Sequence, residues 1–201
     1  MNKLKNPTYP SGNNLFEGKG VILTAAAGAG IGFASAKRFL EEGADIVISD
    51  AHETRLADAT KNLSDLNLGK VASILCDVTD DKAIDDLFNF ADSKLDSVDA
   101  VINNAGLGGE CELINMTNDE WNKVIDITLN GAMKIMRAAI PVLETSQGCI
   151  VNNASVLGWR AQAGQSHYAA AKAGVMALTL SLIHISEPTR QEAISYAVFC
   201  L

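Results

Sequence analysis

The chain has 201 residues, of which 48% are hydrophobic and 20% charged, a composition typical of one ordinary globular domain. Its formal net charge of -8 argues against nucleic acid or an anionic membrane as partner, because an acidic surface repels both. An anionic ligand would therefore have to be held by local devices such as backbone N–H groups.

The first segment, residues 1–17, predicts an irregular arm. It contains two prolines and lacks the apolar run of a signal peptide or a membrane anchor. The cysteines show neither C-x-x-C nor metal-ligand spacing, which favours reduced thiols in a cytoplasmic protein, and the histidines are too scattered to indicate a metal site. These residues are Cys76, Cys111, Cys149, Cys200, His52, His167 and His184.

From Lys19 onward, short apolar runs alternate with helical patterns. The runs are rich in Val and Ile and nearly continuous in apolar residues, as strands buried on both faces are. They are GVILT (20–24), DIVIS (45–49), VASIL (71–75), DAVIN (99–103) and CIVNN (149–153).

The intervening stretches carry the period of amphipathic helices, clearest at 84–95 and 121–136. The acidic run 77–86 resembles a metal cluster only superficially, since Asp80 and Asp81 lie where a helix begins and serve as cap and dipole partner. Strands that alternate with helices predict right-handed crossovers. The fold class is therefore α/β, with a doubly wound, Rossmann-like parallel sheet.

Ligands bind such sheets at the carboxyl ends of the strands, so the residues after each strand are informative. After the first strand comes TAAAGAGIG (24–32), whose small residues let the backbone approach a pyrophosphate at the N-terminus of the next helix. Its spacing departs from the G-x-G-x-x-G fingerprint, so the prediction depends on its position between strand and helix. The predicted cofactor residues here are Gly28, Ala29, Gly30, Ile31 and Gly32.

Polar residues also follow the second and fifth strands. Asp50 is placed to accept hydrogen bonds from a ribose 2′-hydroxyl and to repel a 2′-phosphate, which favours NAD over NADP; an ordinary loop acid is the alternative. Ser155 precedes Tyr168 by thirteen residues. Lys172 shares a helix face with Tyr168, and a nearby ammonium lowers the pKa of a phenol; a solvated lysine beside a half-buried tyrosine is the alternative.

Over residues 18–180 the chain resembles the short-chain dehydrogenase/reductase family. The resemblance rests on the Gly-rich turn, Asp77, NNAG (103–106), Ser155 and YAAAK (168–172), all in order. It implies hydride transfer between a nicotinamide and a carbonyl or secondary alcohol of a small-molecule substrate. It also implies a homodimeric or homotetrameric full-length parent.

The same resemblance implies roles for individual residues. Tyr168 would be the general acid/base, Lys172 would lower its pKa and hold the nicotinamide ribose, and Ser155 would stabilise charge on the substrate oxygen. Asp77 and Val78 would border the adenine. Asn104, Ala105 and Gly106 would line the middle of the cofactor.

Two positions depart from the family pattern. The usual Thr-Gly opening of the turn is Thr24-Ala25 here, with one residue more before the final Gly-x-Gly, and we expect the cradle to persist because alanine is small. In WNKVIDITLNG the family commonly has an asparagine that helps to hold a water against the lysine. Thr128 stands there and can donate one such hydrogen bond, whereas Asn130 points to another side of the helix.

The intact catalytic set favours an NAD-dependent oxidoreductase; the alternatives are an NAD-binding module without turnover and an inactive truncated fragment. The segments TAAAGAGIG, NNAGLGG and NNASVLGWRAQ resemble those of bacterial reductases that act on CoA-linked ring fragments in steroid breakdown. Their second-best resemblance is to 3-oxoacyl-thioester reductases. Candidate apolar walls of the substrate site are Leu107, Leu113 and Trp159.

The end of the chain departs from the family. Pro188 interrupts the helix that begins at Ser166, and neither an Asn-x-x-x-Pro-Gly segment nor a sixth strand follows. We therefore divide the chain into the arm at 1–17, an incomplete dinucleotide-binding and catalytic domain at 18–181, and a tail at 182–201. The tail resembles sequencing-adapter read-through, and a divergent natural tail is the alternative.

Overall fold

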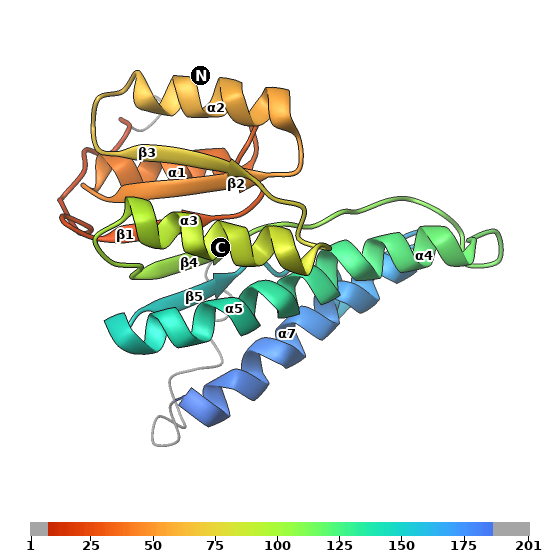
Figure 1. Ribbon diagram of the computed structural model, residues 1–201. Helices are drawn as coiled ribbons and strands as arrows, with labels where there is room; N and C mark the ends of the chain where they lie inside the picture. Colours follow the sequence, from red (N-terminus) through yellow and green to blue (C-terminus); the bar gives the residue numbers. More distant parts are fainter. Residues whose placement is uncertain (1–7, 187–201) are drawn as a thin grey trace, which may run out of the picture.

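A five-stranded parallel sheet forms the centre of the computed structural model, which describes residues 8–186 (Figure 1). Its strands lie in the order β3-β2-β1-β4-β5, and every neighbouring pair is parallel. The strands are β1 (Gly20–Leu23), β2 (Asp45–Asp50), β3 (Val71–Leu75), β4 (Ala100–Asn103) and β5 (Cys149–Asn152). The predicted α/β fold and its five strands are confirmed.

Helices cover both faces of the sheet, as a doubly wound fold requires (Figure 1). One face carries α1 (Ile31–Glu41) and α2 (Glu53–Ser64). The other carries α3 (Asp81–Lys94) and α5 (Gly131–Ser146), with α7 (Ser166–Ser186) beside α5. Two shorter helices, α4 (Asn118–Ile125) and α6 (Leu157–Arg160), contact α7.

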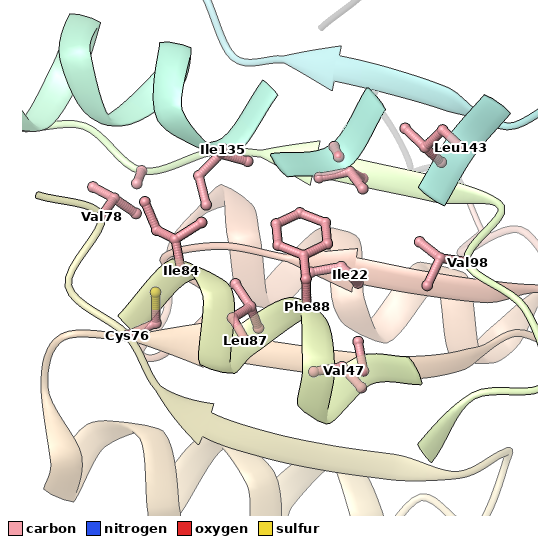
Figure 2. Packing of buried hydrophobic residues seen from close by; sticks show 14 of the residues in the cluster. Ile22, Val47, Cys76, Val78, Ile84, Leu87, Phe88, Val98, Ile135 and Leu143 are labelled. Atoms are coloured by element: carbon pink, nitrogen blue, oxygen red, sulfur yellow. The ribbon is translucent and has the colours of Figure 1, made fainter. Parts of the chain in front are cut away.

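Alternate residues of the strands supply the two layers of the core. Figure 2 shows Ile22 and Val47 of the sheet packed against Leu87 and Phe88 of α3 and Ile135 of α5. On the opposite face, the next residues along β1 and β2 pack against α1 and α2. The period-2 alternation of strand side chains thus serves two hydrophobic layers at once, which is why the runs read as continuous.

The edge strands depart from the predicted burial on both faces. β1 and β4 are buried throughout, whereas no residue of β3 is fully buried and β5 is only partly covered. Leu75 is 51% exposed and Val151 is 38% exposed. The apolar pattern therefore identified the strands correctly, but it did not separate central strands from edges of the described sheet.

The predicted helical period over 121–136 divides into three pieces. Thr117 caps α4 reciprocally with Glu120, each side chain bonding the other's backbone N–H. A single π-helical turn, η1 (Asp126–Asn130), then joins α4 to α5. Such turns insert one residue and often mark functional sites, and this one contains the buried Thr128.

Asp80 caps α3, as predicted. Its carboxylate accepts hydrogen bonds from the backbone N–H groups of Lys82 and Ala83, which explains this part of the acidic run without a metal. Within residues 8–186, no three His, Cys, Asp or Glu side chains gather closely enough to hold a metal ion. None of the helices described there is long and apolar enough to cross a membrane.

Residues 8–17 are irregular but fastened to the C-terminal end of α1. Glu42, which is 5% exposed, accepts hydrogen bonds from the backbone N–H groups of Asn13 and Leu15. Arg38 donates to the Pro10 carbonyl oxygen at 3.0 Å. Of the predicted tail at 182–201, the part from residue 187 onward, including Pro188, lies outside the described residues.

Candidate active site

The turn between β1 and α1 offers unfilled space and free backbone donors. Gly28 has a φ of +92°, and an added Cβ at Gly28 or Gly30 would meet no described heavy atom within 4 Å. Among the described residues, no side chain caps α1 and its first turn holds no acid. The N–H groups and the positive dipole end of this helix are therefore open to an anion, as the turn's small residues predict.

Close packing fixes the other side of the same turn. An added Cβ at Gly32 would lie 2.4 Å from the Ala25 carbonyl oxygen and 2.8 Å from the Asn104 Nδ2. The Asn104 amide donates to the Ala25 carbonyl oxygen at 3.0 Å. Ala25 itself adopts a left-handed φ of 49°, so it occupies a glycine-type conformation at the position where the family has glycine.

The carboxylate of Asp50 lies at the carboxyl end of β2 and joins this turn to its own loop. It accepts hydrogen bonds from the backbone N–H groups of Ala27 at 3.2 Å and His52 at 3.0 Å. The side chain is half-buried beside the Gly-rich turn, where a ribose would be expected.

Asp77 and Val78, which follow β3 after Cys76, differ in what they offer a ligand. Asp77 is exposed, and its carboxylate accepts from the backbone N–H and the hydroxyl of Thr79. Val78 turns its side chain into the core, where an added Cβ at Gly131 would lie 2.6 Å from it. Only the backbone of Val78 is therefore suited to border an adenine.

Lys172 lies one helical turn beyond Tyr168 on α7 and is only 3% exposed. Its Nζ lies 5.7 Å from the centre of the Tyr168 ring and donates a hydrogen bond to the Asn153 carbonyl oxygen. None of the ion pairs among residues 8–186 includes Lys172. Burial lowers the pKa of this ammonium to about 8.

The glycine-rich segment after β4 lies along the first turns of α7. An added Cβ at Gly106 would be 3.4 Å from the Lys172 Nζ, and one at Gly108 would be 3.8 Å from the Tyr168 ring. Leu107 between them is held by Thr128, whose hydroxyl accepts from its N–H at 2.9 Å and donates to its carbonyl oxygen at 3.0 Å. The hydrogen bonds described for the Thr128 side chain thus hold this loop. The sequence instead suggests that the Thr128 hydroxyl would donate to a water near Lys172.

Ser155 lies in the short loop between β5 and α6. Its hydroxyl accepts a hydrogen bond from the Leu157 N–H at 3.2 Å. An added Cβ at Gly158 would lie 3.0 Å from the Lys172 carbonyl carbon and 2.8 Å from the Met176 Sδ, so α6 fits closely against α7. This contact holds the serine-bearing segment beside the helix that carries Tyr168 and Lys172.

Sequence reasoning missed two residues of this region, Thr24 and Asn153. The hydroxyl of Thr24 accepts hydrogen bonds from the backbone N–H groups of Asn104 and Ala105. The amide of Asn153 donates to the Asn104 Oδ1 at 2.7 Å. Both residues lie inside motifs that the sequence singles out, but amide and hydroxyl partners are set by tertiary contacts.

Known proteins resemble this chain along most of its length. The family model described as short chain dehydrogenase matches residues 19–198. A relative from Mycobacterium tuberculosis is 51% identical over 89% of this chain and 69% of its own length. It is named (5R,7aS)-5-hydroxy-7a-methyl-1-oxo-2,3,5,6,7,7a-hexahydro-1H-indene-carboxyl-CoA reductase. A 3-oxoacyl-acyl-carrier-protein reductase from Chlamydia muridarum is 35% identical over 85% of this chain and 68% of its own.

Solved structures give the same result. The crystal structure of a short chain dehydrogenase from Mycobacterium smegmatis is 51% identical, with a TM-score of 0.85, and the match covers 90% of this chain and 76% of that one. NAD-bound xylitol dehydrogenase is 28% identical with a TM-score of 0.82, over 87% of this chain and 67% of that one. Fold, motif order and relatives agree: the chain belongs to the short-chain dehydrogenase family of oxidoreductases.

Proposed function

We propose that the protein transfers a hydride between NAD(H) and a carbonyl or secondary-alcohol substrate. The observation that carries this proposal is the buried ammonium of Lys172 beside the Tyr168 ring. A buried cation is costly unless it has a task, and here the ammonium lies 5.7 Å from the centre of the ring of the proposed proton donor. The mixture of dehydrogenases and reductases among the relatives supports the reaction class.

In the reducing direction, Tyr168 gives its phenolic proton to the substrate oxygen as the hydride arrives at carbon. A reduced nicotinamide held in the cradle would supply that hydride. The Ser155 hydroxyl donates a hydrogen bond to the same oxygen and stabilises the charge that develops there. Lys172 stabilises the phenolate that Tyr168 leaves behind, and its pKa of about 8 keeps most of it protonated at neutral pH.

The residues of the cradle fit an NAD cofactor. The open space at Gly28 and Gly30 and the uncapped start of α1 suit a pyrophosphate, and the exposed Ile31 lies at the mouth of this turn. Asp50 suits the two hydroxyls of an adenosine ribose and would repel a 2′-phosphate. Relatives solved with NAD bound support the same choice.

For the substrate we propose a CoA-linked ring ketone. The support is the name of the Mycobacterium tuberculosis relative and the exposed apolar side chains of Leu113 and of Trp159, each 66% exposed, the latter on α6, which packs against α7. A 3-oxoacyl thioester is the second candidate, supported by the acyl-carrier-protein reductases among the relatives. A panel of both substrate classes with NADH decides between them by relative kcat/KM.

We further propose that the protein is cytoplasmic and homo-oligomeric. The free thiols of Cys76, Cys111 and Cys149 support a reducing compartment. Size-exclusion chromatography with light scattering would measure the oligomeric state.

The catalytic assignment is tested with Tyr168→Phe. This change removes the proton donor and keeps the ring, so turnover should fall by about a hundredfold or more while NADH binding persists. Steady-state kinetics and calorimetric titration of NADH measure the two quantities separately. Near-normal turnover in the variant would contradict the role of Tyr168, and an unmutated protein that binds NADH without turnover would support a binding module instead.

The cofactor assignment is tested with Asp50→Ala. Loss of the carboxylate removes both the hydroxyl acceptor and the repulsion of a 2′-phosphate, so the ratio of NADH to NADPH affinity should fall. Asp45→Ala is the matched control, because it removes a half-buried acid at the opposite end of β2, where its carboxylate accepts a hydrogen bond from the Lys70 N–H. An unmutated protein that already prefers NADPH would refute the choice of NAD.

A further inference from the structure

Two pairs of asparagine amides join β4 to β5 at successive residues. The Asn103 Nδ2 donates to the Asn152 Oδ1 at 2.9 Å, and the Asn153 Nδ2 donates to the Asn104 Oδ1 at 2.7 Å. The first pair continues into the helices, with Asn103 donating to the Ala132 carbonyl oxygen and Asn152 donating to Thr179. The amide N–H groups of this pair therefore join the sheet to α5 and α7.

The second pair leads to the functional groups on both sides. On one side the Asn104 amide donates to the carbonyl oxygens of Thr24 at 3.3 Å and Ala25 at 3.0 Å, which belong to the Gly-rich turn. On the other side the backbone carbonyl of Asn153 accepts the hydrogen bond from the Lys172 Nζ. A continuous path of contacts thus runs from the lysine to the turn that receives the cofactor phosphates.

The chemistry of this path requires a donor at residue 153. Both hydrogen bonds of the Asn104 Nδ2 go to carbonyl oxygens. The side-chain amide therefore cannot flip by 180°, because its Oδ1 would then face two acceptors and lose both hydrogen bonds. Its Oδ1 then accepts, and the Asn153 amide is the group that donates to it. A serine hydroxyl at residue 153 is too short to span the same gap.

We propose that Asn153 is a positioning residue that holds Lys172 and the cofactor turn in fixed relation to each other. The inference rests on the proposed function, since it assigns a purpose to the lysine and the turn. It goes beyond that function because it makes the placement of Lys172 depend on a side chain outside the proposed catalytic and cofactor-binding set, one that donates to Asn104. A change at Asn153 should therefore alter two separate sites together.

The experiment compares Asn153→Ser with the matched control Asn152→Ser in the full 201-residue chain. Both variants lose one amide of an amide pair at the same strand end. Two measurements are made on each: the dissociation constant of NADH by calorimetry, and the pH titration of the Lys172 Cε–Hε signal by NMR without cofactor. Thermal unfolding of each variant reports the general loss of stability.

We expect Asn153→Ser to weaken NADH binding about tenfold, as loss of one well-placed hydrogen bond allows. The Lys172 signal should shift, and its titration midpoint should rise as water reaches the ammonium. Asn152→Ser should leave the NADH dissociation constant within about twofold and the Lys172 titration midpoint unchanged, because its partners are Asn103 and Thr179. This holds even if Asn152→Ser lowers the unfolding temperature more than Asn153→Ser does.

Equal effects of the two variants, or an unchanged Lys172 signal in Asn153→Ser, would overturn the inference. If the unmutated chain does not bind NADH, the proposed function fails, yet the lysine titration still decides the inference by itself. If Asn153→Ser does not fold, Asn104→Ser breaks the same amide bond from the other side. The same shift of the Lys172 signal is then expected, and an unchanged signal refutes the proposal.

Discussion

Around the Gly-rich turn after β1 there is open space, whereas the first turns of α7 are closely packed. An added Cβ at Gly28 or Gly30 would meet no described atom within 4 Å, yet Lys172 on α7 is only 3% exposed. The turn can therefore receive an anion through its backbone, while the packing around α7 holds the Lys172 ammonium beside the Tyr168 ring. Glycines matter in both regions. Gly28 and Gly30 leave space for a ligand, whereas Gly106 and Gly158 let their segments approach α7 closely.

The largest expected effect comes from filling the one closely packed glycine of the turn. Gly32→Ala places a methyl group 2.4 Å from the Ala25 carbonyl oxygen, so the backbone of the turn must shift. We expect a loss of about 1–3 kcal/mol in unfolding free energy and at least about tenfold weaker NADH binding. Denaturant unfolding and calorimetry measure these two quantities.

Gly30→Ala is the matched control for that change. Its φ of -89° is open to any residue and its added Cβ meets open space, so stability should change by less than about 1 kcal/mol. NADH binding should still weaken, because the methyl group stands where the phosphates would lie. Equal loss of stability in both variants would refute the distinction between the open and the packed side of the turn.

The next largest effect concerns the buried ammonium. Its pKa is lowered to about 8 by burial, so the folded state disfavours the proton that the unfolded state keeps up to about pH 10.4. Lys172→Met should therefore raise the unfolding free energy at pH 7 by up to about 3 kcal/mol while abolishing turnover. The gain should shrink as the pH rises from about 8 to about 10.4.

Unfolding curves of the two proteins across this pH range measure the difference directly. Using a difference removes the contribution of other groups, such as the Cys76 thiol, whose pKa burial raises to about 12. A stability gain that stays constant with pH would show that Lys172 is not held in the disfavoured charged form.

The smallest effect is expected at Ala25, which holds a left-handed φ of 49°. Ala25→Gly relieves the contact of its Cβ with the backbone and should stabilise the fold by about 1 kcal/mol or less, since glycine also frees the unfolded chain. The control Ala26→Gly removes a methyl group that is fully buried and should destabilise. Thermal unfolding compares the stabilities of the two variants. A lower unfolding temperature for Ala25→Gly would contradict the inference that Ala25 is strained.

The local pattern of the sequence sufficed for the strands and for several helix ends. Continuous Val and Ile runs located β1 to β5, and Asp80 was identified as a cap, because burial on two faces and capping leave periodic or fixed local signals. The four-residue spacing of Tyr168 and Lys172 also predicted that both lie on one face of a helix, and both are on α7.

Tertiary structure decided how those residues are held. The π-helical turn that directs Thr128 to Leu107 leaves no period in the sequence, and the link from Asn153 to Asn104 joins residues that lie far apart along the chain. Edge exposure of β3 and β5 likewise depends on neighbours across the sheet. Local patterns record backbone geometry and burial, whereas the choice of hydrogen-bond partner is made only when distant segments meet.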